Sequence, residues 1–416
     1  MMRALCTALT SGLIALPALA QPAETPAFPD SLGTVETTLP IPSRGNLGGV
    51  AVDALGYVYV ANFREGVWRI APDGETVLMT NTLYGASGTT LDRQGRLLQA
   101  NFLGHTITRI DRDGTAETVV EDGLNGPVGL VEAPDGSLYV CNCNANAVVR
   151  VAPDRTVRTV AEGERFACPN GITYGPDGAL YVVNFNTDDV LRLDPETGAL
   201  SVVATLPPGG NAHIAFARGN FYVTKITTNQ VYRVTPEGAV TLVAGTGAVG
   251  HDDGPALAAT LSRPNGIAAG PTGAMLYINT LVGTWNGGAP ATIAVRRLKL
   301  ASLTDAVLAA LDGGTPGAVE ATIRRFRAER PDENTLAESI ALGYRLLSGG
   351  QVPASLTVFR LNAEAYPDQP PAHYHLGEGY RYTGQSAPAI AAYERTLELD
   401  PAHQNATNRL SLLRGN

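Results

Sequence analysis

The chain has 416 residues and a formal net charge of −9 at neutral pH, and 44% of its residues are hydrophobic. This length allows two or three domains, and the apolar fraction is sufficient for a real hydrophobic core. The excess of acidic residues does not favour binding to nucleic acid or to an anionic membrane surface, so we expect neither as a partner. The 46 glycines and 28 prolines favour many short strands joined by tight turns.

The first twenty residues have the features of an export signal. Arg3 supplies the positive start, residues 4–16 are mostly apolar, and Ala18-Leu19-Ala20 is a small-residue cleavage site. The apolar run is too short to anchor the chain in a bilayer, and no later stretch is long enough to span one. We therefore predict cleavage after Ala20 and a mature protein in the periplasm or outside the cell. Residues 21–31, rich in Pro and Ala, are predicted to be a flexible lead-in.

Loss of the signal removes Cys6 and leaves Cys141, Cys143 and Cys168. In an oxidising compartment, one disulfide and one free thiol is the simplest arrangement of three cysteines. A metal site is the alternative, but a C-x-C pair with one distant Cys matches no common zinc spacing. The sequence favours the disulfide.

A unit of roughly 40 residues recurs along most of the chain, and this is the period of propeller blades. Its clearest copy, residues 169–185, holds a tight turn, a short strand, a Pro-Asp-Gly hairpin and a second strand that ends at Asn184. The strands alternate apolar and polar residues between glycine-bearing turns. Six units begin near Gly49, Gly88, Gly129, Asn170, His213 and Asn265.

The sixth unit has three strands and no fourth before the pattern changes. Residues 33–40 read as an isolated last strand near the N-terminus. If this strand completes the sixth unit, the ring closes and no sheet edge stays exposed. We therefore predict an all-β six-bladed propeller over residues 32–300, closed by the N-terminal strand.

From residue 301 the hydrophobic period changes from 2 to 3.6, which indicates helices. Glycine pairs and prolines separate the segments. The predicted helices of this all-α domain, residues 301–416, span 303–311, 318–328, 336–347, 353–365, 372–382, 387–399 and 403–413.

The first region resembles an NHL-repeat propeller of the superfamily that includes the gluconolactonase-like (senescence marker) proteins. The resemblance is carried by the P-N-G-I starts at 169–172 and 264–267 and by the P-D-G hairpins at 134–136 and 176–178. It covers roughly residues 32–300 and implies the propeller. Because this fold hosts lyases, lactonases and binding modules, it does not fix an activity.

The last region resembles tetratricopeptide repeats. Six residues fall at consensus packing positions, and a second set precedes them by one period; the first set is Leu376, Gly377, Tyr380, Ala389, Tyr393 and Pro401. The resemblance implies a concave surface that binds a peptide or protein partner.

Polar residues gather where the first strands of the units begin and the second strands end, on one face around the channel. Amide oxygens there suit calcium or the hydroxyls of a sugar-like ligand. The alternative is that each Asn caps its own turn. The predicted ligand contacts are Asn62, Asn101, Asn142, Asn184, Lys225 and Asn265.

The resemblance to gluconolactonase-like proteins implies that Asn170 holds a divalent cation, calcium or zinc. The other positions of that metal and substrate site do not agree, since Leu47-Gly48-Gly49, Ala212 and Pro127 stand there. His213 occupies a strand start where other units have Gly or a small residue. It is a candidate metal ligand or general base, against the simpler reading of a hydrogen-bonded turn histidine.

A long loop between the fifth and sixth units carries His251, Asp252 and Asp253, which together with His213 are a further candidate site. Cys143 replaces the Phe of neighbouring units, close to Cys168 on the same face. A Cys143–Cys168 bridge, or a Cys141–Cys168 bridge, would clamp two adjacent blades at the channel mouth.

Two functions follow from these observations. The first is a binding module whose propeller face holds a small ligand or peptide and whose helices hold a protein partner. The second is a gluconolactonase-like, metal-dependent hydrolase or lyase with its site at the channel mouth. The missing acidic ligands favour the binding module.

Overall fold

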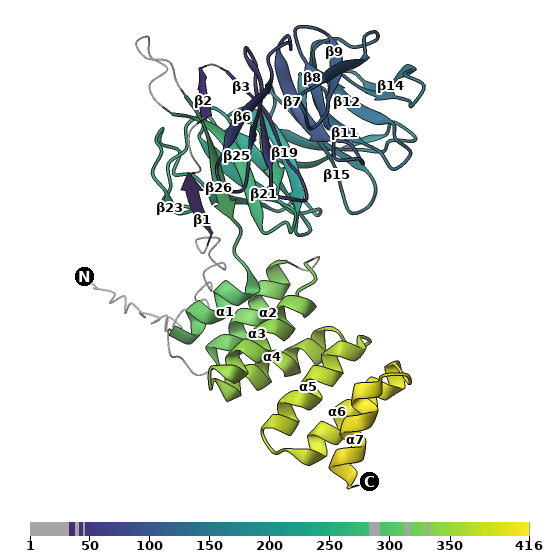
Figure 1. Ribbon diagram of the computed structural model, residues 1–416, viewed down its shortest axis with the longest axis vertical. Coiled ribbons are helices and arrows are strands. Elements are labelled where there is room, and N and C mark those ends of the chain that lie inside the picture. The colour runs from purple at the N-terminus through teal and green to yellow at the C-terminus, as the bar shows by residue number, and fades with distance from the viewer. Residues whose placement is uncertain are drawn as a thin grey trace, which may run out of the picture.

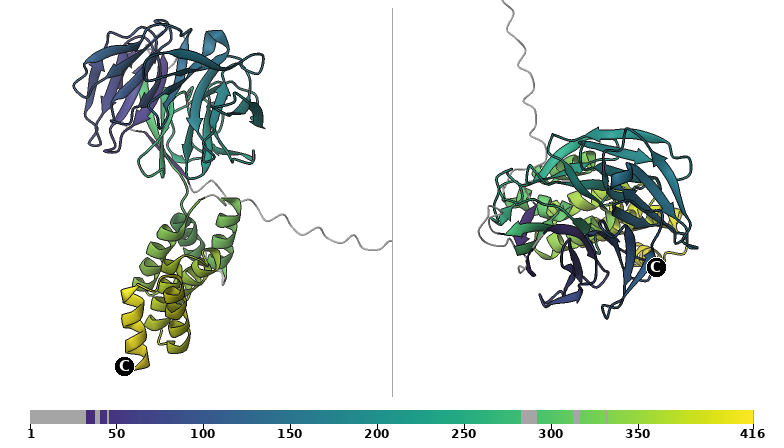
Figure 2. Two further views of the ribbon diagram at one scale, coloured as in Figure 1. Left: turned by 90° about the vertical axis from the view of Figure 1, so that its right-hand side faces the viewer. Right: turned by 90° about the horizontal axis from the view of Figure 1, so that it is seen from above.

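A computed structural model describes residues 33–37, 41–44, 46–282, 292–312, 317–330 and 333–415. Within these ranges the chain forms six β-sheets arranged as a propeller, followed by seven helices that extend away from one end of it (Figure 1). The views in Figure 2 show the sheets as blades around a centre and the helices below them. The predicted export signal and lead-in, residues 1–31, lie outside the described residues.

Blades 1 to 5 are four-stranded antiparallel sheets whose strands follow chain order. Blade 1 contains β3 (Leu47–Val52), β4 (Val58–Asn62), β5 (Gly66–Ile70) and β6 (Thr76–Thr80), and blade 2 contains β7 (Ala86–Leu91), β8 (Leu97–Asn101), β9 (Thr106–Ile110) and β10 (Ala116–Val120). Blade 3 contains β11 (Pro127–Glu132), β12 (Leu138–Asn142), β13 (Ala147–Val151) and β14 (Val157–Glu162), and blade 4 contains β15 (Pro169–Tyr174), β16 (Leu180–Asn184), β17 (Asp189–Leu193) and β18 (Leu200–Thr205). Blade 5 contains β19 (Asn211–Ala217), β20 (Asn220–Lys225), β21 (Gln230–Val234) and β22 (Val240–Ala244).

Blade 6 is completed by the N-terminal strand, as predicted. It contains β24 (Ile267–Ala269), β25 (Met275–Val282), β26 (Thr292–Lys299) and β1 (Thr34–Thr37), with Val35 opposite Leu298. Two short strands were not predicted: β2 (Ile41–Arg44) also pairs with β26, and β23 (Gly254–Pro255) covers the outer edge of β1. Both are too short for their residues to show the period-2 alternation that marks a strand.

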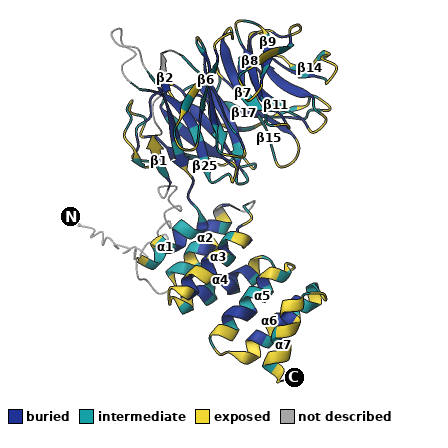
Figure 3. Cartoon of the chain, in the orientation of Figure 1, coloured by how far each residue is buried: buried dark blue, intermediate teal, exposed yellow. Residues whose placement is uncertain are grey.

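The core is divided among the blade interfaces. Six clusters of buried hydrophobic residues each join two neighbouring blades in the part of the chain that the structure describes. One of them packs Val60 of blade 1 against Val295 of blade 6, so the ring is closed by side chains as well as by hydrogen bonds. The second strands of blades 1 to 5 are fully buried, whereas the fourth strands consist mostly of intermediate and exposed residues (Figure 3).

The helical domain follows the predicted segments to within two residues at each end. Its helices are α1 (Leu303–Asp312), α2 (Ala318–Glu329), α3 (Leu336–Ser348), α4 (Val352–Ala365), α5 (Pro370–Tyr382), α6 (Ser386–Leu399) and α7 (Gln404–Arg414). Small residues lie where helices cross: a Cβ at Gly343 would come within 2.4 Å of the Phe359 ring, and one at Gly377 within 2.6 Å of Tyr393. Among the described helices none is long and apolar enough to cross a membrane.

The two domains meet at the end of the propeller where the chain leaves β26. Arg218, in the turn between β19 and β20, lies with its Nη1 3.5 Å from the carboxylate of Glu333 and donates a hydrogen bond to the carbonyl of Ala301. Burial raises the pKa of Glu333, and the nearby Arg218 and Arg330 oppose this shift. This contact fixes the helices against blade 5 as well as against blade 6.

Candidate functional site

The second strands of all six blades end at the same face, which we call the mouth. In blades 1 to 5 the last residues of these strands are the predicted contacts Asn62, Asn101, Asn142, Asn184 and Lys225. In blade 6, Asn279 lies three residues before the end of β25, and at most 3% of each of the six residues is exposed. Most of these amides hold loops of their own propeller. For example, Asn184 accepts from the Ala167 amide and donates to the carbonyl of Arg165, and Asn279 donates to the carbonyl of Gly48.

Lys225 replaces the asparagine in blade 5 and makes a buried ion pair. Its Nζ lies 2.5 Å from Asp188 and donates to Asn211 at 2.9 Å. Burial lowers the pKa of Lys225, while Asp188 raises it. Because both acceptors belong to the protein, this ammonium is already paired in the described structure.

A second set of four side chains connects blades 2, 3, 4 and 5 each to the following blade at the mouth. Each lies just before a third strand and accepts a backbone N–H from the following blade. His105 accepts the backbone N–H of Gly126 through Nδ1. In the same way, the side-chain oxygens of Asn146, Asp188 and Asn229 accept the backbone N–H groups of Cys168, Gly209 and Arg263, respectively.

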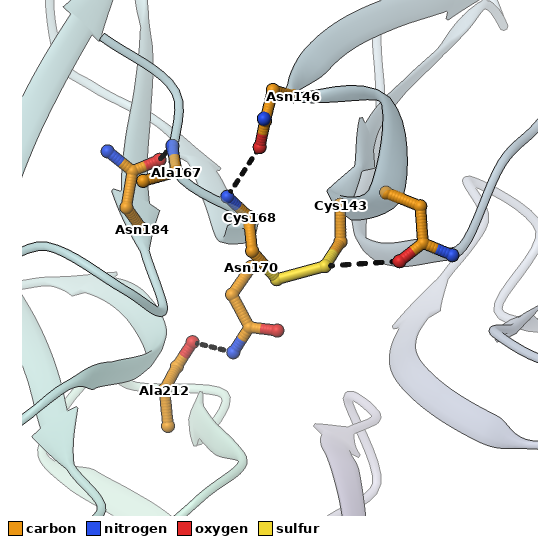
Figure 4. Close-up of a disulfide and its surroundings, with 8 residues drawn as sticks. Cys143, Asn146, Ala167, Cys168, Asn170, Asn184 and Ala212 are labelled. Carbon is orange, nitrogen blue, oxygen red and sulfur yellow. Dashed lines mark hydrogen bonds between the residues drawn. A yellow bond between two sulfur atoms is a disulfide. The ribbon is translucent and has the colours of Figure 1, made fainter. Parts of the chain in front are cut away.

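A disulfide joins Cys143 to Cys168 and therefore blade 3 to the entry of blade 4 (Figure 4). This settles the partner that the sequence left open, and Cys141 is the free, buried cysteine. Burial raises the pKa of the Cys141 thiol, so it is not a reactive thiolate at neutral pH. The Asn170 amide lies beside the disulfide (Figure 4).

Below the mouth, the innermost strands approach so closely that glycine is required. A Cβ added to Gly129 would lie 2.6 Å from the Asn170 carbonyl of the next blade, and one at Gly171 would lie 2.8 Å from the amide of Ile214. In blade 5 the position of Gly171 is occupied by His213. The strand register shows this, because Gly171 precedes Ile172, which pairs with Val182, and His213 precedes Ile214, which pairs with Val223. His213 is the side chain that departs from the ring formed by Gly49, Gly88, Gly129, Gly171 and Gly266.

Thr224 holds the His213 backbone between blades 5 and 6. Its Oγ1 accepts from the His213 amide at 3.1 Å and lies 2.5 Å from the carbonyl of Asn265. The imidazole of His213 lines a channel cavity of about 260 Å³ and makes no hydrogen bond within the described residues. Burial lowers its pKa from 6.5 to about 4, so the ring is neutral at pH 7.

Two predicted residues flank His213 on the neighbouring blades. Asn170 donates through Nδ2 to the carbonyl of Ala212, directly before His213. Asn265 donates to the carbonyls of Leu47 and Gly48 on blade 1. In both, the described structure leaves Oδ1 without a hydrogen bond, and only 8% of each residue is exposed. Three polar residues thus lie at the start of consecutive blades.

The donor set does not match a typical divalent-cation site. Calcium and zinc sites in proteins usually include carboxylate or thiolate ligands, whereas Asn170 and His213 offer one neutral oxygen and one neutral ring. No group of three or more His, Cys, Asp or Glu side chains among the described residues could hold a metal ion.

The long loop does not bring its acidic residues to His213. Asp253 accepts from the amide and hydroxyl of Thr37 on β1 and pairs with Arg296 at 2.7 Å. The carboxylate of Asp252 accepts a hydrogen bond from the hydroxyl of Thr260, which belongs to the same loop. The loop therefore fastens the closing strand through Asp253, and none of His251, Asp252 and Asp253 lines the cavity beside His213.

Residues 36–246, slightly more than half of the chain, match the sequence model of the virginiamycin B lyase family. No curated protein matches the chain. Among solved structures, a gluconolactonase from Xanthomonas campestris is 19% identical with a TM-score of 0.50, covering 62% of this chain and 87% of that one. An auxiliary nutrient binding protein from Bacteroides ovatus is 16% identical with a TM-score of 0.53, covering 65% and 77%. At these identities the structural likeness concerns the fold alone.

Proposed function

Because the chain belongs to the virginiamycin B lyase family, we propose that its propeller binds a small polar ligand at the mouth of the central channel. The observation that carries this proposal is the unpaired imidazole of His213 above a cavity, flanked by Asn170 and Asn265 with free amide oxygens. A neutral imidazole and two amide oxygens supply hydrogen-bond acceptors and one ring N–H donor. This set suits a neutral ligand rich in hydroxyl groups.

The electrostatics of His213 favour binding over acid–base catalysis. A general base works best when its pKa is close to the working pH. Burial holds the pKa of His213 at about 4, so the ring accepts a proton poorly at neutral pH. The same neutral ring remains a good hydrogen-bond partner over the whole physiological range.

A thermal-shift measurement tests this proposal. Both tryptophans of the chain, Trp68 and Trp285, belong to the propeller part of the sequence, so their fluorescence reports its unfolding. Glucose, gluconate and glucono-1,5-lactone at millimolar concentration are the probes. We expect at least one to raise the melting temperature of the wild type and of Asn186→Ala, an exposed mouth residue, but not of His213→Ala or Asn170→Ala.

The binding proposal fails if no probe stabilises the wild type, or if the two site variants respond like Asn186→Ala. Ligand binding to the folded state alone raises stability in proportion to the logarithm of ligand concentration. A concentration series therefore separates site occupancy from a general solvent effect.

A lyase or hydrolase is the second candidate, and family membership is the observation that favours it. In that case His213 would be the catalytic base, with its pKa raised by the bound substrate. Ring opening of virginiamycin B or of glucono-1,5-lactone, followed by mass spectrometry, tests this candidate. Turnover that is lost in His213→Ala and retained in Asn186→Ala would favour the enzyme over the binding module.

We also propose that the helical domain binds a protein or peptide partner and that the chain works outside the cytoplasm. Repeated helix pairs with small residues at their crossings, as at Gly343 and Gly377, support the first. The Cys143–Cys168 disulfide supports the second, because such bonds persist in oxidising compartments. Mass spectrometry of the N-terminus of the exported protein tests cleavage after Ala20.

A further inference from the structure

A second, larger cavity of about 730 Å³ lies between blades 3 and 4 at the end opposite the mouth. The register of β11 and β12 places it: Glu132 pairs with Leu138 at this end, and Pro127 pairs with Asn142 at the mouth. Its walls come from the ends of inner strands and from the turns that follow them. This volume is in the range of small-molecule sites.

Tyr139 is a largely buried side chain that lines this cavity. Only 3% of Tyr139 is exposed, yet its hydroxyl makes no hydrogen bond in the described structure. The equivalent tyrosines elsewhere are paired with an aspartate of the preceding turn: Tyr59 donates to Asp53, and Tyr181 donates to Asp177. The same position is therefore satisfied in blades 1 and 4 and left open in blade 3.

In blade 3 the turn aspartate is Asp135, and Ser137 donates to it where Tyr181 donates to Asp177 in blade 4. The Oδ2 of Asp135 accepts from the Ser137 hydroxyl at 3.1 Å and from Arg150 at 2.5 Å. Tyr139 is left without the partner that its counterparts have. The hydroxyl oxygen is not enclosed by protein atoms, so it is open to a ligand in the cavity.

The rim of the cavity is acidic. Glu132, Asp135 and Glu196 line it together with Arg93. Arg150 neutralises Asp135, whereas Glu196 makes no ion pair and no side-chain hydrogen bond within the described residues. Glu132 accepts only the backbone N–H of Arg93. The cavity therefore holds more negative than positive charge.

The walls between these charges are aromatic and apolar. Tyr139 and Tyr174 pack edge to face, with centroids 6.3 Å apart, and Pro134, Pro176 and Pro195 complete the lining. Aromatic rings attract cations through their faces. The proline rings provide apolar surface against which the carbon atoms of a ligand can pack.

We propose that this cavity binds a small organic ammonium ion, that is, a protonated amine on an apolar carbon frame. The aromatic rings and prolines take up the carbon frame, and Glu132 and Glu196 balance the charge. The hydroxyl oxygen of Tyr139 accepts an N–H of the ammonium group. An anion is disfavoured, because the two carboxylates without an ion pair outnumber Arg93 in the lining.

The test is an amide-shift NMR titration of the full-length protein with benzylammonium chloride, with benzyl alcohol as the neutral counterpart. We expect the ammonium ion to shift amides of residues 132–139 and 174–178, and the alcohol to bind at least tenfold more weakly. Tyr139→Phe should weaken binding about fivefold, the typical effect of one lost hydrogen bond. The double variant Glu132→Gln/Glu196→Gln should weaken it about tenfold.

Tyr59→Phe is the matched control, since it removes the equivalent hydroxyl from blade 1, where the hydroxyl is already paired. It should leave the affinity unchanged. Equal affinity for the alcohol, equal weakening by Tyr59→Phe, or no binding of the ammonium ion would overturn the proposal. If Tyr139→Phe does not fold, the carboxylate variants decide alone, because both side chains are partly or fully exposed.

Discussion

His213 makes the stability of the propeller depend on pH. Its pKa is about 4 in the folded protein because of burial, against about 6.5 for an unfolded histidine. Between these values the unfolded state binds a proton that the folded state excludes, so stability is full above pH 6.5 and falls toward pH 4. We expect this residue to cost the propeller about 2 kcal/mol of unfolding free energy between pH 7 and pH 5.

Urea unfolding followed by tryptophan fluorescence at both pH values measures this loss. The variant His213→Gln should lose about 2 kcal/mol less than the wild type over the same interval. His373→Gln, on helix α5 outside the propeller, is the control and should behave like the wild type. Identical pH dependence in His213→Gln and the wild type would contradict the buried, neutral state of this ring.

The disulfide between Cys143 and Cys168 closes a loop with a sequence separation of 25. In the chain-entropy account, a loop of this length contributes about 3 kcal/mol by restricting the unfolded state. The double variant Cys143→Ser/Cys168→Ser should lower the unfolding free energy of the propeller by that amount. The wild type with reducing agent in the same urea series should show the same loss, and so should Cys141→Ala, because it keeps the disulfide. The double variant should not respond to reduction. An unchanged urea midpoint in both the double variant and the reduced wild type would contradict a stabilising role of the disulfide.

At the scale of residues, the sequence predicted what each repeat shares and missed what depends on neighbours. The alignment of strand starts was enough to single out His213 among glycines. It could not show that the Asn184 amide is occupied by Arg165 and Ala167, because loop hydrogen bonds have no periodic signature. The open hydroxyl of Tyr139 was missed for the same reason: only Ser137, two residues earlier, hinted that Asp135 would be taken.

At the scale of elements, the closing strand β1 is the feature on which the ring depends. Only 1% of Val35 is exposed, and the residue packs in one cluster with Leu298 and Leu300. Val35→Ala should lower the unfolding free energy of the propeller by about 2 kcal/mol, through lost burial and a residual cavity. The adjacent Glu36→Ala is the matched control and should cost less than about 1 kcal/mol, since Glu36 makes an exposed ion pair with Arg297.

Tryptophan fluorescence in urea measures both variants. Similar small losses in the two would mean that β1 adds little to the closed ring. The sequence predicted this strand because one outer strand was missing from blade 6 and one was spare at the N-terminus. It did not predict β2 and β23, since strands of four and two residues leave no pattern to detect.

At the scale of the whole molecule, a partly buried ion pair holds the helices against the propeller. The side chains of Arg218 and Glu333 are 19% and 8% exposed, and Arg330 lies 4.0 Å from the same carboxylate. Arg218→Glu would place two carboxylates together where burial already raises the pKa of Glu333. Each domain has its own core, so both should stay folded while the contact between them opens.

Hydrogen exchange and small-angle scattering test this. In Arg218→Glu we expect amides of residues 300–306 to exchange at least about tenfold faster, which corresponds to a loss of about 1.4 kcal/mol, and the radius of gyration to increase. The helical circular dichroism and the tryptophan emission should match the wild type. Arg155→Glu is the control. Arg155 is an exposed residue of blade 3 that lies 3.6 Å from Glu117 and makes no ion pair with the helical domain among the described residues. The proposed ligand cavity between blades 3 and 4 lies at the same end of the propeller as the helical domain. If Arg218→Glu opens the contact between the domains and leaves the affinity for benzylammonium unchanged, the cavity is formed by the propeller alone.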